Sequence, residues 1–290
     1  MSSVLFDNPG PRARVRNRIL GGLVILLVVA VFAFILWRFA ESGQFSAEKW
    51  RAFRYPLVWQ SIGAALGQTL GAFAAAGVAS LVLGLVLAVG RLSDRRWISL
   101  PVTTFIELFR AIPVLILMML MYYGLPFIGL KLTPYLAVVI ALTLYNGSVF
   151  SEIFRAGIEA LPRGQKEAGY AIGLRKAGVM RLILFPQAIR TMLPVIIAQL
   201  VVALKDTALG SIITYNELLY YAKYLGNQSS LDSPIIPAAI VIGAIYISIC
   251  LLLSGLAKWI EVRTKSMGRG GTGHPAARAT TNTALIAAQD

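Results

Sequence analysis

The chain has 290 residues, of which 57% are hydrophobic and only 14% are charged. A soluble domain carries about 25% charged residues, so this composition excludes an ordinary soluble protein. The net charge of +14 does not indicate nucleic-acid binding, because the basic residues lie in short segments between long apolar runs. That alternation is typical of a membrane protein with cationic cytoplasmic loops. The single cysteine, Cys250, excludes an internal disulfide bond and argues against a cysteine-based metal site.

The N-terminal region contains a basic segment, residues 1–18, and then an uncharged run that predicts a transmembrane helix over residues 19–39. A signal peptide has a shorter apolar core, of about 7–15 residues, and a small-residue cleavage site. No such site follows this run, so we expect an uncleaved first span. Residues 40–62 then form an extracytoplasmic or interfacial segment, with an interfacial piece around Pro56–Gln60.

Five further spans are predicted in the rest of the chain, which makes an all-α membrane protein with about six spans. They are placed at residues 63–90, 98–123, 133–154, 187–205 and 233–258. The polar segment 159–186 separates the fourth span from the fifth. The last segment, residues 263–290, is rich in Gly, Ala and Thr and lacks periodicity, so we expect a disordered tail.

The distribution of Lys and Arg predicts the orientation. Basic residues are concentrated in segments 1–18, 91–97, 155–187 and the tail, whereas the alternate loops have fewer. By the positive-inside rule both termini are cytoplasmic, and so is the polar segment 159–186.

Small residues recur four apart in the second predicted span, at Gly63, Gly67 and Gly71 and again at Gly84 and Ala88. Such spacing allows close approach between helices in lipid. We expect packing within the chain, with contact to a second subunit as the alternative.

Ionisable residues inside spans are costly, so each is a candidate for a functional site. Glu107 and Arg110 are three residues apart on one helical face, where they either neutralise each other or line a substrate path. Glu152 and Arg155 repeat that spacing at the end of the fourth span. Lys205 and Asp206 close the fifth span, as a snorkelling pair or as path residues. The candidate substrate-path residues are Glu107, Arg110, Glu152, Lys205 and Asp206.

No catalytic or nucleotide-binding motif is found. Gly268, Gly270 and Gly273 have G-x-G-x-x-G spacing, but neither a strand before nor a helix after them is expected. The only histidine, His274, lies in the same tail. The G-x-x-x-x-G-K-[ST] pattern is absent, so if ATP drives this protein the ATPase is a separate chain. We therefore expect no catalytic residue, no metal ligand and no bound cofactor.

The polar segment predicts a short helix over residues 165–176, preceded by Pro162 and ended by Gly178. Pro186 kinks or starts the next element. The helix is either an amphipathic connector or a docking surface for a soluble partner.

The same segment resembles the EAA signature of ABC importer permeases. That signature is E-A-A, three residues, G, nine residues, then I-x-L-P, and the matching residues are Glu167, Ala168, Gly169, Gly173 and Ile183–Pro186. Gly169 replaces the third Ala and Phe185 the usual Leu. The flanking runs "SEIFRAGIEALPRGQKEAG" and "LKDTALGSIITYNELL" resemble the polar amino-acid uptake permeases. The N-terminal part is similar to the extra first span of actinobacterial glutamate-uptake permeases.

This resemblance implies the permease of a type I importer in a bacterial cytoplasmic membrane. Its partners would be an ABC ATPase dimer that holds ATP and Mg, a second permease, like or unlike, and an extracellular solute-binding protein that delivers a polar amino acid, which we expect to be glutamate. The residues that the resemblance implies for ATPase coupling are Glu167, Ala168, Gly169, Gly173 and Pro186. We predict that Gly173→Glu uncouples transport without preventing membrane insertion.

Three alternatives remain at the level of sequence. One is a permease of the same type for glutamine or a basic amino acid. Another is a stand-alone secondary transporter, although such folds usually show inverted repeats and none is clear here. The last is a membrane enzyme, which would need a cluster of His, Asp, Glu or Cys that this chain hardly supplies.

Overall fold

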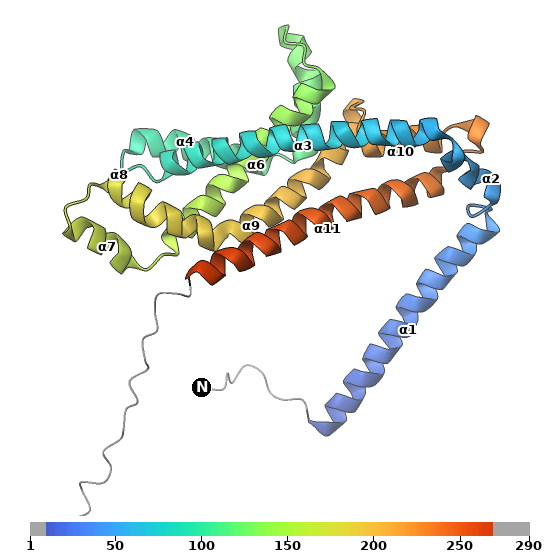
Figure 1. Cartoon of the computed structure of the whole chain (residues 1–290), viewed down its shortest axis with the longest axis horizontal. Helices are drawn as coiled ribbons and strands as arrows, with labels where there is room; N and C mark the ends of the chain where they lie inside the picture. The colour runs from blue at the N-terminus through green and yellow to red at the C-terminus, as the bar shows by residue number, and fades with distance from the viewer. Residues whose placement is uncertain (1–9, 269–290) are drawn as a thin grey trace, which may run out of the picture. The chain divides into compact units, whose positions relative to one another are not determined.

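The computed structural model describes residues 10–268, and every regular element in that range is helical (Figure 1). Five segments in it are long and apolar enough to cross a membrane, and a sixth span results if one broken pair of helices is counted together. The predicted all-α membrane fold with about six spans is therefore confirmed.

The helices alternate between long and short elements. The long ones are α1 (Pro11–Glu41), α3 (Pro56–Arg91), α4 (Arg96–Ala111), α6 (Pro134–Glu159), α9 (Phe185–Asp206) and α11 (Ile235–Gly268). The short α-helices are α2 (Ala47–Trp50), α5 (Val114–Met119), α7 (Arg163–Ala171), α8 (Lys176–Gly178) and α10 (Leu218–Gly226). Two short π-helices are η2 (Leu120–Gly124) and η4 (Val179–Leu184). Short 3₁₀-helices are η1 (Arg51–Arg54), η3 (Leu125–Ile128), η5 (Thr207–Ile213) and η6 (Ser229–Leu231).

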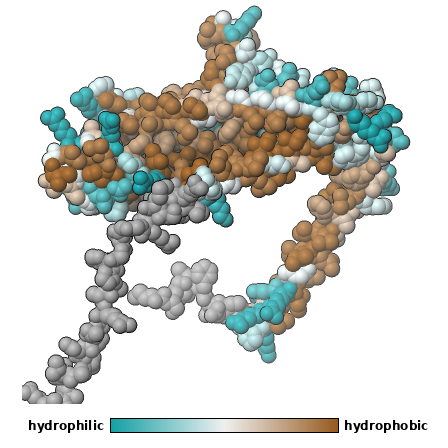
Figure 2. Space-filling view, in the orientation of Figure 1, coloured by the Kyte–Doolittle hydropathy of each residue, from teal (hydrophilic) through white to brown (hydrophobic). Residues whose placement is uncertain are grey.

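Helix α1 is apolar around its whole circumference over residues 19–37, and none of its residues is buried. Figure 2 shows hydrophobic residues along most of its length and hydrophilic residues at its start. A helix that is hydrophobic on every side suits a lipid environment. Residues 11–18, expected as a separate basic segment, belong to this helix because Pro11 takes its first position, where a missing N–H costs nothing.

Helix α3 begins at Pro56, so residues 56–60 are its first turns and not a separate piece, while their interfacial position stays a prediction. Proline again starts the helix, and no breaker follows it. The Trp59 indole N–H donates to the Phe53 carbonyl at 2.9 Å and anchors this first turn to the preceding η1.

The third predicted span, 98–123, is not a single helix. Helix α4 ends at Ala111 and α5 begins at Val114. Pro113 disfavours helical backbone at the residue before it, and Ile112 is accordingly extended, with φ −82° and ψ 124°. The chain therefore has a broken span at this point. Pro113, which is visible in the sequence, could have predicted the break.

The chain divides into two compact units. The first unit contains residues up to Ala76, Val114–Ala141 and Leu204–Ser248. The second contains Gly77–Pro113, Leu142–Ala203 and the chain from Ile249 onward. Several long helices contribute to both units.

Within the second unit, α3 packs closely against α6. The core includes Ala88, Phe150, Phe154 and Ile196. A Cβ atom added at Gly84 would lie 2.6 Å from the Phe150 Cβ atom, so only glycine permits this approach. Packing within the chain is thus confirmed at Gly84 and Ala88.

Within the first unit, the small residues of α3 behave differently. A Cβ atom added at Gly63, Gly67 or Gly71 would meet no atom within 4 Å in the described part of the chain. The expectation of packing within the chain was wrong at these three positions. Nearby, Thr69 is fully buried and its hydroxyl accepts a hydrogen bond from the Leu218 N–H at 3.2 Å.

Helix α10 is fixed by a buried carboxylate in the same unit. Glu217 accepts hydrogen bonds from the N–H groups of Leu219 and Tyr220, at 2.8 and 2.7 Å, and from the Tyr246 hydroxyl at 2.6 Å. These three donors satisfy a carboxylate that has no solvent exposure.

The end of the chain is partly described. Helix α11 continues to Gly268, so residues 263–268, expected as the start of a disordered tail, are helical. The rest of that expected tail, together with His274, Gly270 and Gly273, lies outside the described residues.

Candidate functional site

The segment 159–186 forms the helix that the sequence predicted, but with different limits. Helix α7 begins at Arg163, directly after Pro162, and ends at Ala171 rather than at 176. The expected terminator, Gly178, lies instead within the next helical segment, at the end of α8. We call the span from Pro162 to Lys176 the α7 loop.

Gly173 terminates α7. Its φ of +82° is left-handed, a conformation that side chains with a Cβ atom rarely adopt. The Gly173 N–H donates to the Tyr170 carbonyl at 2.9 Å, and the Leu174 N–H donates to the Gly169 carbonyl at 3.2 Å. These two bonds form a Schellman motif, which satisfies carbonyl groups that the helix end would leave unpaired.

Gly169 is the buried residue of α7. A Cβ atom placed there would lie 2.8 Å from Ile183 Cδ1 and 2.9 Å from Val179 Cγ2. Gly169 therefore lets α7 pack directly against η4 of the same chain. The departure from the usual alanine has a structural reason: a methyl group would need both side chains to shift.

Glu167 and Ala168 are exposed on α7. Pro186 is the second residue of α9, which follows the π-helix η4 directly. A proline ring clashes with the carbonyl four residues before it, and the wider turn of a π-helix accommodates such a ring. Of the five predicted coupling residues, Glu167 and Ala168 are thus exposed and Gly169 is buried. Gly173 and Pro186 lie at helix ends.

A polar contact joins the α7 loop to another part of the second unit, through residues that the sequence analysis did not single out. The Lys176 ammonium lies 2.5 Å from Asp94 Oδ1 and donates to the Leu92 carbonyl at 3.0 Å. Leu92 and Asp94 belong to the turn between α3 and α4. Nothing local in the sequence indicates this contact, because its partners are 84 residues apart at Leu92 and Lys176.

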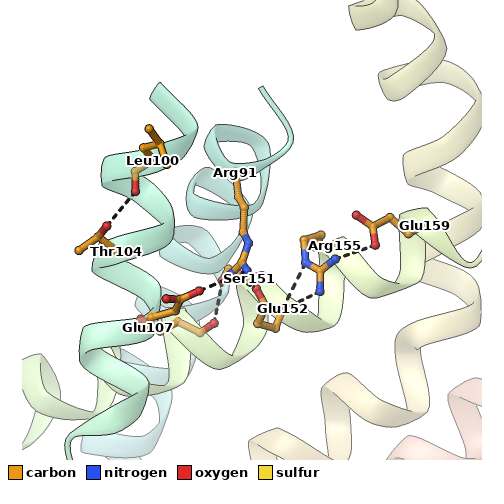
Figure 3. A network of polar contacts seen from close by, with 9 residues as sticks. Arg91, Leu100, Thr104, Glu107, Ser151, Glu152, Arg155 and Glu159 are labelled. Carbon is orange, nitrogen blue, oxygen red and sulfur yellow. Dashed lines mark hydrogen bonds and ion pairs between the residues drawn. The ribbon is translucent and has the colours of Figure 1, made fainter. Parts of the chain in front are cut away.

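A cluster of charged residues joins α3, α4 and α6 (Figure 3). Arg155 binds Glu152 at 2.9 Å and Glu159 at 2.6 Å, which confirms the predicted pair of Glu152 and Arg155. Arg91 forms an ion pair with Glu152 and lies 3.7 Å from Glu107. The predicted neutralisation of Glu107 by Arg110 is wrong, since the ion-pair partner of Glu107 is Arg91.

Arg110 is exposed near the end of α4, and within the described residues it forms no ion pair. Its charge is therefore uncompensated at close range. Sequence spacing gave the wrong partner because it places Arg110 and Glu107 on one helical face but contains no information about neighbouring helices. In the structure, Arg91 approaches the Glu107 carboxylate from α3.

Lys205 and Asp206 are not part of this cluster. They end α9 and belong to the first unit, whereas Glu107, Arg110 and Glu152 belong to the second. Lys205 is exposed and Asp206 is half-buried, and the two form no ion pair with each other. Within residues 10–268, no group of three or more His, Cys, Asp or Glu residues is placed to hold a metal ion.

Comparison with known proteins adds a family and several relatives. The family described as "Binding-protein-dependent transport system inner membrane component" matches residues 80–266. A glutamate transport system permease, GluD of Corynebacterium glutamicum, is 40% identical over 227 residues, covering 76% of this chain and 81% of the relative. A probable glutamine ABC transporter permease, GlnP of Bacillus subtilis, is 32% identical over 186 residues, covering 64% and 85%.

A solved structure of an amino acid ABC transporter is similar in fold and in sequence. Its chain is 31% identical, the TM-score is 0.65, and the match covers 70% of this chain and 94% of that one.

Proposed function

The chain belongs to the family of binding-protein-dependent transport system inner membrane components, and from this premise we propose that it carries glutamate across the membrane. It is a permease subunit of an ABC importer for amino acids, and not itself an enzyme. The glutamate assignment is the finer step. It is supported by the similarity to a glutamate permease and by the charge of one residue.

That residue is Arg110, and the substrate assignment depends on the observation that it forms no ion pair within the described residues. Glutamate carries a net negative charge, so its path favours an uncompensated cation. Because Glu107 is paired with Arg91 and not with Arg110, the Arg110 guanidinium remains available to bind an anionic substrate. A charge-assisted hydrogen bond is about twice as strong as a neutral one, so an arginine that faces the side-chain carboxylate favours glutamate over a neutral amino acid, which has only its α-carboxylate.

The energy for transport is supplied, in this proposal, by a separate ATPase dimer that binds ATP and Mg and docks on α7. Glu167 and Ala168 form the exposed contact surface, since both point away from the chain's own core. Gly169 lies on the opposite, buried side of α7 and lets the helix pack against η4. Gly173 ends the helix in a fixed backbone conformation. A helix held in this way transmits displacement, whereas a flexible loop would absorb it.

Alternating access follows from that displacement. Closure of the ATPases on ATP draws the α7 loops of two permeases together, and the helices that follow open the path to the outside. Hydrolysis then releases the loops and returns the path to the inside. A solute-binding protein outside the membrane delivers the amino acid, and a second permease, like or unlike, completes the path.

The membrane in this proposal is the bacterial cytoplasmic membrane, with both termini inside. Support comes from the Arg-rich start of α1 and from the basic residues of the α7 loop, which the positive-inside rule places on one side. Reporter fusions placed in the loop after α10 and in the α7 loop distinguish this orientation from its inverse.

Uptake in proteoliposomes tests the assignment of substrate. The complex with its ATPase and binding protein is given labelled glutamate, glutamine or arginine, with and without ATP. We expect ATP-dependent uptake with glutamate preferred. Uptake that continues without ATP and stops when the proton gradient collapses would refute the energetic scheme, and preference for glutamine or arginine would refute the substrate.

Arg110→Ala tests the residue. We expect the KM for glutamate to rise about tenfold, which corresponds to the loss of one charged hydrogen bond. Arg110→Lys keeps the charge and serves as the control, with a smaller change. Unchanged glutamate kinetics in Arg110→Ala would remove this residue from the path.

A further inference from the structure

The turn between α3 and α4, residues 92–95, contacts the α7 loop through one lysine. The Lys176 ammonium is 2.5 Å from Asp94 Oδ1 and donates to the Leu92 carbonyl at 3.0 Å. Leu92 directly follows the last residue of α3, where the helix dipole concentrates negative charge. A single ammonium therefore binds both a carboxylate and the carbonyl end of a helix.

Asp94 also faces α7 itself. Its pKa lies below the usual value, first because it accepts a hydrogen bond from Lys176 and also because of the charges of Lys176 and of Lys166 on α7. Of these two cations, Lys176 forms an ion pair with Asp94, and Lys166 acts only through its charge. Because the lowered pKa keeps that carboxylate ionised near neutral pH, its charge is available to Lys176 there.

Two clefts lie beside this polar contact. A cavity of about 380 Å³ lies on one side of Lys176, between its aliphatic neighbours and α3, α6 and α9, and a second of about 340 Å³ lies on the side of α7. Both cavities include Leu92, Asp94 and Lys176 in their walls. The polar contact is consequently a specific link across a loosely filled region.

The turn leads directly to the charged residues of the candidate path. Arg91, at the end of α3, binds Glu107 of α4 and Glu152 of α6. Helix α4 starts immediately after the turn, at Arg96, and carries Arg110 near its other end. Because α4 follows the turn without an intervening loop, we expect a displacement of the turn to displace α4 as well.

We propose that Lys176, bound to Asp94 and the Leu92 carbonyl, is a positioning residue that transmits the movement of α7 to α4 and so couples ATP hydrolysis to passage of the amino acid. This inference rests on the proposed function of α7 as the ATPase-docking helix. It adds a second route for the movement, through the α3–α4 turn, to the covalent one through η4 and α9.

The test is the number of amino acids transported per ATP hydrolysed. The complete complex, with ATPase and binding protein, is reconstituted with Lys176→Met or Asp94→Asn, and uptake and ATP hydrolysis are measured together. We expect the ratio to fall about two- to fivefold, the factor that corresponds to the coupling energy of an exposed ion pair, while the ATPase still copurifies.

Arg175→Met is the matched control. Arg175 is the neighbouring cation, is exposed, and forms no ion pair within the described residues, so its loss leaves the ratio unchanged. Lys176→Arg keeps the positive charge and the donors to Asp94 and the Leu92 carbonyl, so it retains most of the ratio, which loss of folding would not do. High salt lowers the wild-type ratio toward that of Lys176→Met, because exposed ion pairs are screened.

Two outcomes are distinguishable. If the wild-type complex shows no ATP-driven uptake, the proposed function fails. If the wild-type complex transports and Lys176→Met transports with the same ratio, the function stands and this inference is overturned. Asp94 has an 81% exposed side chain, so Asp94→Asn folds even if Lys176→Met does not, and its ratio decides the question alone.

Discussion

At the scale of single residues, the two glycines of the α7 loop have different physical roles, although both belong to one sequence signature. Gly169 provides space, because its missing Cβ atom admits Val179 and Ile183. Gly173 provides a backbone conformation, since its φ is +82° and no atom crowds it within the described chain. The sequence located both residues but could not separate these roles, which depend on the neighbours of one and the dihedral angle of the other.

Gly169→Ala is expected to lower the unfolding free energy by about 1–2 kcal/mol, because the added methyl group overpacks the contact between α7 and η4. Thermal unfolding of the purified chain in detergent measures this change. Gly164→Ala is the control in the same helix: a Cβ atom there meets no atom within 4 Å in the described chain, so we expect no loss. Equal effects of the two substitutions would contradict the packing explanation.

Gly173→Ala is expected to open the end of α7. A left-handed conformation costs a residue with a Cβ atom about 1–2 kcal/mol, so hydrogen exchange of the α7 amides should accelerate about five- to thirtyfold. Gly173→Asn should accelerate it less, because asparagine tolerates that conformation. The predicted uncoupling by Gly173→Glu would combine this strain with a new charge, so the Ala and Asn variants isolate the backbone effect. Equal exchange rates in Gly173→Ala and Gly173→Asn would contradict the explanation by backbone conformation.

At the scale of elements, the close approach of α3 and α6 depends on one position. The sequence identified a stripe of small residues along α3, but only the tertiary structure separates Gly84, which meets Phe150, from Gly63, Gly67 and Gly71, which meet nothing in the described chain. Spacing alone cannot separate them, because all these residues have the same local pattern and differ only in what lies opposite.

Gly84→Ala is expected to lower the unfolding free energy by about 2–3 kcal/mol, because the new methyl group would lie 2.6 Å from the Phe150 Cβ atom, which the backbone holds in place. Gly67→Ala on the same helix should leave it unchanged. Thermal unfolding of both variants in detergent provides the comparison. If Gly67→Ala instead weakens association of two permeases, measured by crosslinking in membranes, the alternative of a subunit contact applies to that part of the stripe.

At the scale of the whole molecule, helix α1 differs from the other long helices because it contributes no buried residue. No residue of α1 is buried, whereas α3 and α6 each bury a substantial share of their apolar windows. The matched family region, residues 80–266, also excludes α1. The fold of the remaining chain should therefore not depend on this helix.

Deletion of residues 1–41 is expected to change the unfolding free energy of the remaining chain by less than about 1 kcal/mol, because no buried contact is lost. Thermal unfolding and copurification of the ATPase measure the outcome, with the full-length chain as reference. An unfolded or aggregated product would show that α1 makes contacts that its exposure does not reveal.

The sequence by itself determined the class of the protein. The length and apolar character of its runs specified an all-α membrane fold, and the spacing of Glu167, Gly173 and Pro186 specified the family, because both signals are local and periodic. Only the tertiary structure decided which charges meet. Glu107 is bound by Arg91 rather than by its helical neighbour Arg110, and Lys176 binds Asp94. These contacts depend on how the helices pack and on which side chains this packing brings together, and no periodic pattern along the chain contains that information.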